Sequence, residues 1–358
     1  MKKILLLGEF SSLHLNLKEG LQELGFSPVL AGRSDGFKKI PVDISFESTF
    51  PYPMSIVHRY INPVLKLKKL KYFDIVQLIN PFYCLSRSHN SFVSRWFHNQ
   101  VIENNGKFFL VNAGDDAIFW QVTKNILRYS HLDDFLAFDA RKKSYYMQKR
   151  SALVFNNWIA SRASGIIPTA YEYEIGYHNF PNLRHIIPMP INTLKIKYEP
   201  NVIKNKITVF HGLNRYGHKG TKYVVEAFRR LESKYPNHLE LIIDGKLPLN
   251  QYLKLLSRVN VVVDQLNSYS CGMNALYAMC LGKIVIGGAE PESLRSLGVD
   301  FSPVLNVQPD ANDLVRRIEY ILDNRSSITE LGWKSRSFVE KVHCHIKVAD
   351  LYLKQWQM

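Results

Sequence analysis

The chain alternates between two kinds of apolar pattern. Short continuous apolar runs are typical of strands buried on both faces, and apolar residues at every third or fourth position are typical of helices with one buried face. In the first half, the short runs predict strands at residues 3–7, 28–31, 75–78, 107–111 and 165–168. After the first strand, Ser12 is placed to begin a helix with Leu13, Leu17, Leu21 and Leu24 on one face, and Gly25 ends it.

The second half repeats the alternation. Strands are predicted from residue 206 and at residues 239–243, 261–263 and 283–286. Helices are predicted from Thr221 to before Pro236 and at residues 251–258, 274–281, 311–322 and 348–356. The inner face of the first of these helices is predicted to carry Val224, Val225, Phe228 and Leu231. Strand–helix alternation of this kind indicates an α/β fold with parallel, doubly wound sheets.

Residues 182–206 interrupt the alternation with an extended piece that contains Pro188 and Pro190. Proline punctuation of this kind is typical of a connection between domains. We therefore predict an N-terminal domain at 1–187, a linker at 188–205, a second domain at 206–340 and a C-terminal helix at 341–358.

Composition supports two domains and excludes several classes of protein. The chain is 46% apolar, enough for two cores, and no run reaches the roughly 18 apolar residues of a membrane-spanning helix. The apolar run near Met1 stops after four residues, which is too short for a signal peptide. The cysteines, Cys84, Cys271, Cys280 and Cys344, are few and scattered, as expected in a reducing cytoplasm.

The net charge of +15 suggests an anionic partner, although a solvated basic surface without a specific partner is the simpler alternative. Nucleic acid, an anionic membrane and phosphorylated small molecules are the three classes to consider. The sequence shows no zinc-finger spacing, basic heptads or RNA-binding signature, so we expect no nucleic-acid partner.

Glycines and cations coincide where predicted strands turn into helices, from Thr208 to Glu292. The first such stretch is His211-Gly-Leu-Asn-Arg-Tyr-Gly-His-Lys-Gly-Thr221, and a later one, Cys271-Gly-Met, precedes a predicted helix. In an α/β sheet, a phosphate-bearing ligand binds at such junctions, because helix N-termini and backbone amides attract anions.

These stretches resemble the donor half of GT-B glycosyltransferases, in particular the retaining family-4 type (glycosyl transferases group 1). The resemblance is strongest over residues 185–300 and consistent over 1–180. It implies two Rossmann-like, doubly wound parallel-sheet domains facing a cleft, the first on the acceptor side and the second binding the nucleotide sugar. It also implies that the C-terminal helix crosses back to the first domain.

The resemblance further implies a hexosyltransferase that moves a sugar from a UDP- or GDP-linked donor to an acceptor hydroxyl. The acceptor would be a glycan or a lipid-linked molecule of bacterial surface polysaccharide synthesis, and the protein would work in the cytoplasm, at the inner face of the plasma membrane. No cofactor or metal is expected, because cations and a helix end neutralise the leaving diphosphate.

Lys219, before Gly220, matches the lysine–glycine pair that holds the diphosphate in the family, and Arg215 matches the accompanying arginine at a shorter spacing. Solvated loop cations are the alternative interpretation. Where the family has two glutamates eight positions apart, this chain has Tyr269 and Tyr277, and a tyrosine cannot accept two hydroxyls as a carboxylate does. The predicted donor contacts are His211, Gly212, Asn214, Asp264, Tyr269, Ser270, Cys271, Gly272, Tyr277 and Glu290.

Some of these donor contacts have simpler alternatives. The amides of Ser270, Cys271 and Gly272 either point at the distal phosphate or simply cap the helix that follows. The imidazole of His211 at a strand end either contacts phosphate or is packed in the core. Glu290 either lies near the donor or is a surface acid.

On the acceptor side, the resemblance points to the loop that carries Gly8 and Glu9. After the strand at 107–111 come Asp115 and Asp116. A carboxylate there either orients an acceptor hydroxyl or acts as a base, and the alternative is a cap for the next helix. The run His343-Cys344-His345 is not expected to bind metal, because adjacent residues point apart and no further ligand has suitable spacing.

Cations and apolar residues are interleaved at 59–71 and at 141–150, with Trp158 nearby. This pattern favours peripheral contact with an anionic membrane, and an ordinary surface helix is the alternative. Two other functions stay open within the same fold: a nucleotide-sugar 2-epimerase, and a non-catalytic binding protein, for which the two tyrosines are the main argument.

Overall fold

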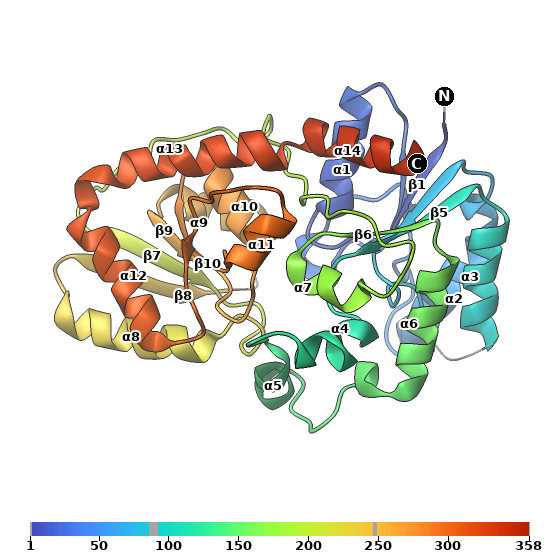
Figure 1. Cartoon of the computed structure of the whole chain (residues 1–358), viewed down its shortest axis with the longest axis horizontal. Coiled ribbons are helices and arrows are strands. Elements are labelled where there is room, and N and C mark those ends of the chain that lie inside the picture. Colours follow the sequence, from blue (N-terminus) through green and yellow to red (C-terminus); the bar gives the residue numbers. More distant parts are fainter. Residues whose placement is uncertain (1, 86–91, 246–248, 358) are drawn as a thin grey trace. The chain divides into compact units, whose positions relative to one another are not determined.

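Both halves of the chain fold into parallel sheets with helices between the strands (Figure 1). The structure is a computed structural model that describes residues 2–85, 92–245 and 249–357. It divides into two compact units. The first contains Met1–Ile126, Tyr146–Pro190 and His345–Met358, and the second contains Leu127–Tyr145 and Ile191–Cys344.

The strands of the first unit form a parallel sheet, in the order β3-β2-β1-β4-β5-β6 among the described residues. Its strands are β1 (Ile4–Leu7), β2 (Val29–Gly32), β3 (Ile44–Ser45), β4 (Ile75–Leu78), β5 (Lys107–Asn112) and β6 (Gly165–Pro168). Its helices are α1 (Leu13–Glu23), α2 (Met54–Leu65), α3 (Phe92–Glu103), α4 (Ala117–Gln121), α6 (Arg150–Arg162), α7 (Tyr171–Glu174) and α14 (His345–Gln357).

The strands of the second unit form a parallel sheet in the order β11-β10-β9-β7-β8 over the same described part of the chain. Its strands are β7 (Ile207–Gly212), β8 (Leu239–Asp244), β9 (Val261–Val263), β10 (Ile284–Gly287) and β11 (Leu305–Asn306). Its helices are α5 (Leu132–Asp134), α8 (Thr221–Lys234), α9 (Leu249–Ser257), α10 (Met273–Cys280), α11 (Pro291–Ser296), α12 (Ala311–Asp323) and α13 (Ile328–Phe338).

These elements confirm the predicted α/β fold with parallel sheets. Two predicted core positions are wrong. Val225 is 45% exposed because it lies at the edge of the buried face of α8, and Leu24 is 37% exposed because it follows Glu23, the last residue of α1. Gly25 and Gly282, predicted to end helices, have φ of +86° and +83°, a backbone conformation that glycine adopts without strain.

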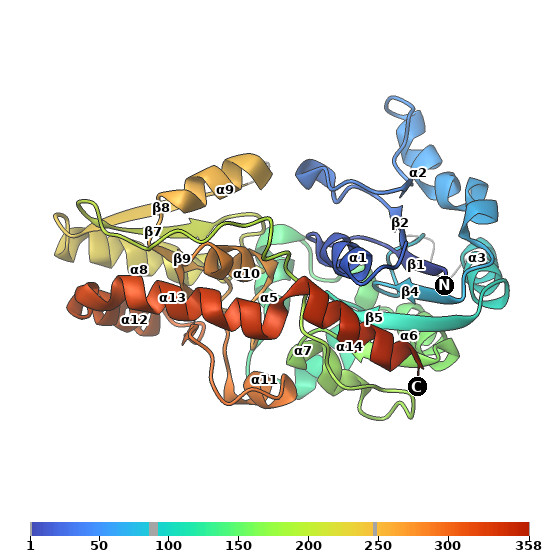
Figure 2. The same cartoon turned by 90° about the horizontal axis from the view of Figure 1, so that it is seen from above.

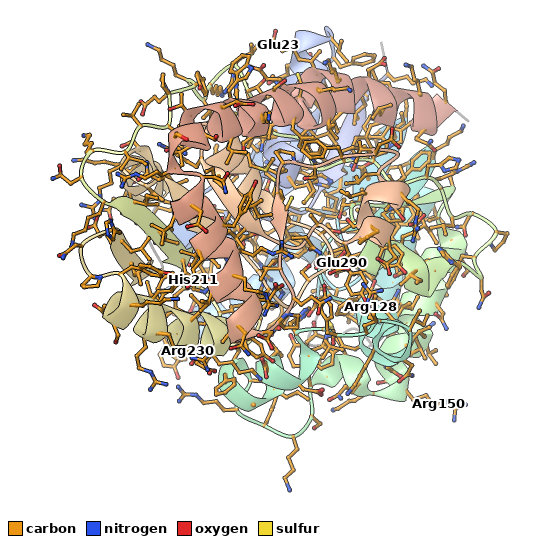
Figure 3. All side chains as sticks on the ribbon, turned by 60° about the vertical axis from the view of Figure 1, so that its left-hand side comes forward. Glu23, Arg128, Arg150, His211, Arg230 and Glu290 are labelled. Atoms are coloured by element: carbon orange, nitrogen blue, oxygen red, sulfur yellow. The ribbon has the colours of Figure 1, made fainter. Side chains whose placement is uncertain are left out.

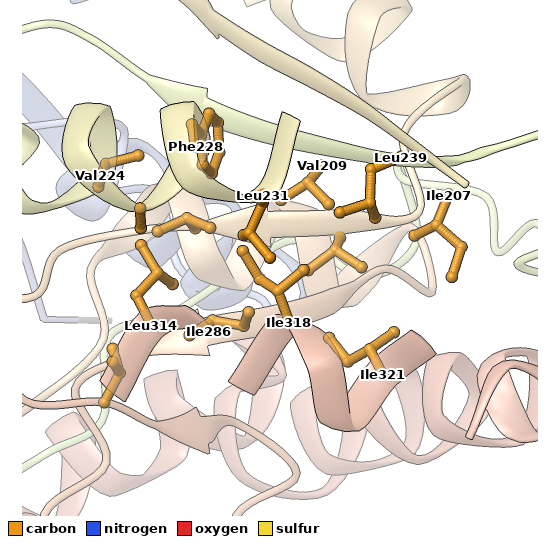
Figure 4. Packing of buried hydrophobic residues seen from close by; sticks show 14 of the residues in the cluster. Ile207, Val209, Val224, Phe228, Leu231, Leu239, Ile286, Leu314, Ile318 and Ile321 are labelled. Atoms are coloured by element: carbon orange, nitrogen blue, oxygen red, sulfur yellow. The ribbon is translucent and has the colours of Figure 1, made fainter. Parts of the chain in front are cut away.

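The core of the second unit lies between its sheet and the helices α8 and α12 (Figure 4). Val224, Phe228 and Leu231 of α8 meet Leu314 and Ile318 of α12, and all are buried. The spacing of three and four residues along each helix is what places these side chains on one face.

The C-terminal helix α14 belongs to the first unit and packs against α1 (Figures 1 and 2). Tyr352 and Trp356 are fully buried in the core of that unit, and the indole Nε1 of Trp356 donates to Oε1 of Gln77 at 3.0 Å. A Cβ at Gly20 would lie 2.2 Å from the carbonyl oxygen of His345, so only glycine allows the two helices to approach this closely.

The chain enters the second unit at Ile191, inside the predicted linker at 188–205, and leaves it after Cys344. The amide of Ile191 donates to the carbonyl oxygen of His343 at 2.8 Å, so these two passages of the chain lie side by side within the second unit. No sequence pattern predicted that residues 127–145 fold with the second unit. Among the described helices, none combines the length and apolar character needed to cross a lipid bilayer.

Candidate functional site

The connections of the second sheet diverge between β7 and β9. From β7 the chain passes to β8 on one side, and the later strands lie on the other side, beginning with β9. His211 and Val263 are paired in register at this place, so Gly212 and Asp264 emerge together at the carboxyl ends of the two strands. In open parallel sheets, ligands bind at this kind of divergence. This is the candidate site of the second unit.

Lys219 and Asp264 form a buried ion pair at the centre of the candidate site. The Nζ atom of Lys219 lies 3.1 Å from Oδ1 of Asp264, and the two residues are 8% and 2% exposed. The other carboxylate oxygen of Asp264 accepts the amide of Gly272 at 3.0 Å, at the beginning of α10. Three residues predicted for the donor site are therefore brought together. Asp264 contacts both the ammonium group of Lys219 and the amide of Gly272, the two groups that we predicted to bind phosphate.

His211 is buried, and both of its ring nitrogens are used inside the second unit. Its Nδ1 lies 2.9 Å from the carbonyl oxygen of Val263 and its Nε2 2.9 Å from Oγ1 of Thr221. Burial lowers the pKa of His211 to about 4, so the ring is neutral at pH 7. Of the two interpretations of His211, the structure shows the packed one: the ring ties β7 to β9 and to α8.

The loop from Asn214 to Gly220 carries the other predicted cation. Arg215 is exposed, and Asn214 is partly buried. The amides of Gly217 and His218 both donate to Oδ2 of Asp139, each at 3.0 Å. Sequence reasoning missed Asp139, because it lies 78 positions before Gly217 and no spacing connects the two.

Glu290 is buried and surrounded by donors from the same unit. Its carboxylate accepts from Arg128 at 2.6 Å, and Figure 3 labels both residues. It also accepts from the hydroxyl of Tyr129 at 2.7 Å and from Nδ2 of Asn306 at 3.0 Å. The structure therefore does not place Glu290 at the surface. Arg128 and Tyr129 were not predicted from the sequence.

Tyr269 lies beside the same arginine. Its hydroxyl accepts the amide of Arg128 at 2.8 Å, and its ring centre lies 4.9 Å from that of Tyr129 and 5.0 Å from the guanidinium of Arg128. Tyr269 and Glu290, both predicted donor contacts, are thus joined through Arg128 and Tyr129.

The remaining predicted donor residues surround the beginning of α10. The hydroxyl of Ser270 lies 2.7 Å from that of Ser293 on α11. Cys271 is partly exposed, and Tyr277 is buried on α10.

The corresponding divergence in the first sheet lies between β1 and β4, next to Gly8 and Glu9. Gly8 has φ of +103°, and a Cβ there would lie 2.3 Å from Cγ2 of Ile79. Glu9 is 1% exposed, and its Oε2 accepts the amide of Leu15 at 2.8 Å. Its Oε1 has no hydrogen-bond partner among the described residues. Burial raises the pKa of Glu9 to about 8, so this carboxyl is mostly protonated at pH 7.

Asp116 caps a helix. Its Oδ1 accepts the amide of Phe119 at 2.8 Å at the beginning of α4, and its Oδ2 accepts the hydroxyl of Tyr177 at 2.6 Å. It is fully buried, and burial raises its pKa to about 6. Of the two interpretations of this pair, the structure shows the cap for Asp116, whereas Asp115 is only partly buried and its carbonyl accepts from Nδ2 of Asn80.

No protein-family model and no curated protein matches the sequence. Solved structures do match. Sucrose-phosphate synthase from Thermosynechococcus elongatus is 16% identical, with a TM-score of 0.66, over 100% of this chain and 98% of that one. HepE from Anabaena in complex with UDP-glucose is 12% identical, with a TM-score of 0.62, over 100% of both chains. A glycosyltransferase from Rickettsia africae is 12% identical, with a TM-score of 0.56, over 99% of this chain and 98% of that one.

The fold is GT-B. At these identities the likeness concerns architecture, and it extends over the whole chain. The two parallel-sheet units, with α14 in the first of them, are the GT-B arrangement that the sequence predicted.

Proposed function

We propose that this protein is a glycosyltransferase that moves a sugar from a nucleotide-diphosphate sugar to an acceptor hydroxyl. The observation that carries the proposal is the gathering of Lys219, Asp264 and the beginning of α10 where the second sheet's connections diverge. The GT-B fold supports it, since a matched structure of that fold was solved with UDP-glucose bound.

The chemistry follows from the charge that develops on the leaving diphosphate. Lys219 and the exposed Arg215 supply positive charge, and α10 supplies the positive end of its dipole, worth roughly half a unit charge. Groups that meet charge developing in the transition state raise the rate more than they tighten donor binding. Retention of anomeric configuration, a UDP- or GDP-linked hexose and a role in bacterial surface polysaccharide synthesis are the finer parts of the proposal, supported by the sequence resemblance.

The test begins with a thermal-shift screen of the full chain against UDP-, GDP- and CMP-sugars, followed by acceptor-dependent release of the nucleotide. Lys219→Met should then reduce turnover by at least about 100-fold, the scale of a lost charge-stabilising group. Lys234→Met, an exposed lysine at the other end of α8, is the matched control and should keep full turnover. Equal turnover of the two variants would remove Lys219 from the reaction.

A non-catalytic binding protein is the second candidate, favoured by a specific observation. Tyr269 and Tyr277 replace the two carboxylates of the family pattern, and Lys219 is already paired with Asp264. This candidate predicts a thermal shift with a nucleotide or glycan and no turnover with any acceptor. A chain that releases nucleotide only when acceptor is present excludes it.

Peripheral contact with an anionic membrane belongs to the same proposal and is supported by α2. Met54, Val57, Ile61 and Leu65 recur every three or four residues along this helix, and each is between 44% and 66% exposed. Residues 50–72 contain five lysines and arginines and no carboxylate. An exposed apolar helix face flanked by cations fits the headgroup layer of an anionic bilayer and supports a lipid-linked acceptor at the cytoplasmic face. The second interleaved stretch, at 141–150, is divided between the two units after Tyr145.

Vesicle sedimentation tests the membrane contact. The protein should sediment with phosphatidylglycerol vesicles at low salt, stay in solution with phosphatidylcholine vesicles, and be released by salt. Ile61→Glu should abolish sedimentation, while Phe301→Glu, at an exposed position of the second unit, should not. Equal sedimentation of both variants would contradict the assignment to α2.

A further inference from the structure

Residues 127–145 lie in the first half of the sequence but fold with the second unit, and we call them the inserted segment. The inserted segment contains α5 and a π-helical turn, Phe135–Asp139. Nothing in the sequence resemblance gives it a role. Its contacts within the second unit fall on the residues of the candidate site.

Asp139 holds the loop that carries the predicted diphosphate ligands. Two successive amides of that loop, from Gly217 and His218, converge on one carboxylate oxygen of Asp139 at 3.0 Å. Hydrogen bonds to an ionised acceptor are roughly twice as strong as those between neutral groups. The bonds therefore fix the backbone between Arg215 and Lys219, at the second residue after Arg215 and at the residue directly before Lys219.

The inserted segment and the loop are packed too closely to move independently. A Cβ at Gly217 would lie 2.1 Å from the carbonyl oxygen of Asp134, so a glycine is required at this contact. The carboxylate of Asp134 pairs with Lys222 on α8 at 2.6 Å, and the ring centres of His131 and His218 are 3.9 Å apart. Burial lowers the pKa of His218 well below its usual value, which keeps its ring neutral in this packing.

The other end of the inserted segment holds the second part of the candidate site. Arg128 bonds to the carboxylates of Glu290 and Glu292, and its backbone amide reaches the hydroxyl of Tyr269. One segment of 19 residues thus touches both the loop before α8 and the residues around the beginning of α11.

The carboxylate of Asp139 accepts two backbone amides, and a side chain that competes with a bound phosphate for those amides would make the same contacts. The contacts favour a different role, because the inserted segment is held to the second unit at Arg128, at Asp134 and at Asp139. Several of the groups that hold it, among them Glu290 and His218, are buried, as expected for a permanent part of the unit. We infer that the inserted segment is part of the donor-binding unit and that Asp139 is a positioning residue, which holds Arg215 and Lys219 in place through the amides of Gly217 and His218. The inference rests on the proposed function for its donor.

The test uses the full chain with Asp139→Ala and Asp139→Asn. Asparagine keeps a carbonyl oxygen that accepts both amides, whereas alanine leaves them without an acceptor. Two quantities are measured: hydrogen exchange of residues 214–220, and the affinity for UDP and GDP by calorimetry. The matched control is Asp133→Ala, which removes an exposed carboxylate from the same segment.

Asp139→Ala should accelerate exchange of the loop amides and weaken nucleotide binding, each by about tenfold, the scale of one lost charged hydrogen bond. Asp139→Asn should change both quantities less than Asp139→Ala does, because its neutral carbonyl oxygen still accepts the amides. Asp133→Ala should stay within about threefold of the wild type. Should Asp139→Ala fail to fold, Gly217→Ala pushes the inserted segment off the same loop and should produce the same two changes.

Three results would overturn the inference. Unchanged exchange in Asp139→Ala means that Asp139 does not hold the loop. Tighter nucleotide binding in both Asp139 variants means that the carboxylate competes with phosphate. Unchanged nucleotide affinity in Asp139→Ala, with the wild type binding, removes the positioning role and leaves the proposed function standing. A wild type that binds neither nucleotide is the separate failure of the proposed function, and the donor role of the inserted segment fails with it.

Discussion

Lys219 and Asp264 form a buried ion pair, with Nζ and Oδ1 3.1 Å apart. The lysine lies on the loop before α8, and the aspartate directly follows β9. A diphosphate that binds here meets a lysine already paired. The carboxylate therefore fixes where the ammonium group points before any ligand arrives, and it limits how much positive charge a ligand meets.

This pairing predicts that the loss of either partner destabilises the protein. Lys219→Met leaves the carboxylate of Asp264 buried without its cation, and we expect a loss of about 3–5 kcal/mol in the free energy of unfolding. The double variant Lys219→Met/Asp264→Asn should recover most of that stability and none of the turnover. Urea unfolding and a turnover assay check both statements, and additive losses in the double variant would contradict the pairing.

The raised pKa of the buried Glu9 predicts that the free energy of unfolding depends on pH. Its pKa is about 8 in the folded protein and 4.5 in the unfolded chain. Because the folded state binds the proton more tightly, the stabilisation is complete below pH 4.5 and is lost as the pH rises through 8. Glu9→Gln should match the wild type at pH 4 and exceed it by a growing margin between pH 4.5 and pH 8, reaching on the order of a few kcal/mol at pH 8. Thermal unfolding at pH 4 and pH 8 checks this, and parallel curves would contradict it.

The burial of Trp356 predicts that the C-terminal helix α14 contributes strongly to the free energy of unfolding. It is fully buried and bonded to Gln77, so Trp356→Ala should cost about 3–5 kcal/mol. Trp333→Ala, at a tryptophan of α13 that is 52% exposed, is the matched control and should cost much less. Equal losses in chemical denaturation would argue against the packing described for α14.

Removal of metal should leave the proposed reaction unchanged. The proposal neutralises the leaving diphosphate with Arg215, Lys219 and the end of α10. Dialysis against EDTA followed by a turnover assay should therefore give at least about 80% of the untreated rate, a change that corresponds to only a small part of 1 kcal/mol in the barrier. A loss that returns on addition of Mg²⁺ or Mn²⁺ would show that a cation takes part.

Most of the strands were predictable because they are short, largely apolar runs, whereas the two-residue strands β3 and β11 were not predicted. The runs at 75–78, 165–168 and 261–263 are strands β4, β6 and β9 with the predicted bounds. The helix α3 was not predicted, since its pattern is partly reversed. Ser94 and His98 face the interior, while Phe92 and Trp96 are exposed.

The candidate site was predictable only where neighbours in sequence are neighbours in space. Lys219 and Gly220 carry a local signature, and Gly272 lies directly before α10. The bond from Arg128 to Glu290 joins residues 162 positions apart, and Asp139 reaches Gly217 across 78 positions. Such contacts are decided by the packing of whole elements, which hydrophobic periodicity does not describe.

The placement of α14 delays completion of the N-terminal core during synthesis of the chain. The first unit needs Tyr352 and Trp356 to fill its core, and both leave the ribosome after all of the second unit. Part of the apolar surface of the N-terminal sheet therefore stays exposed to water until synthesis of the chain is almost complete. Premature termination after Pro168 but before residue 345 would release a chain whose N-terminal part cannot bury its own interior, even though every strand of that sheet is present.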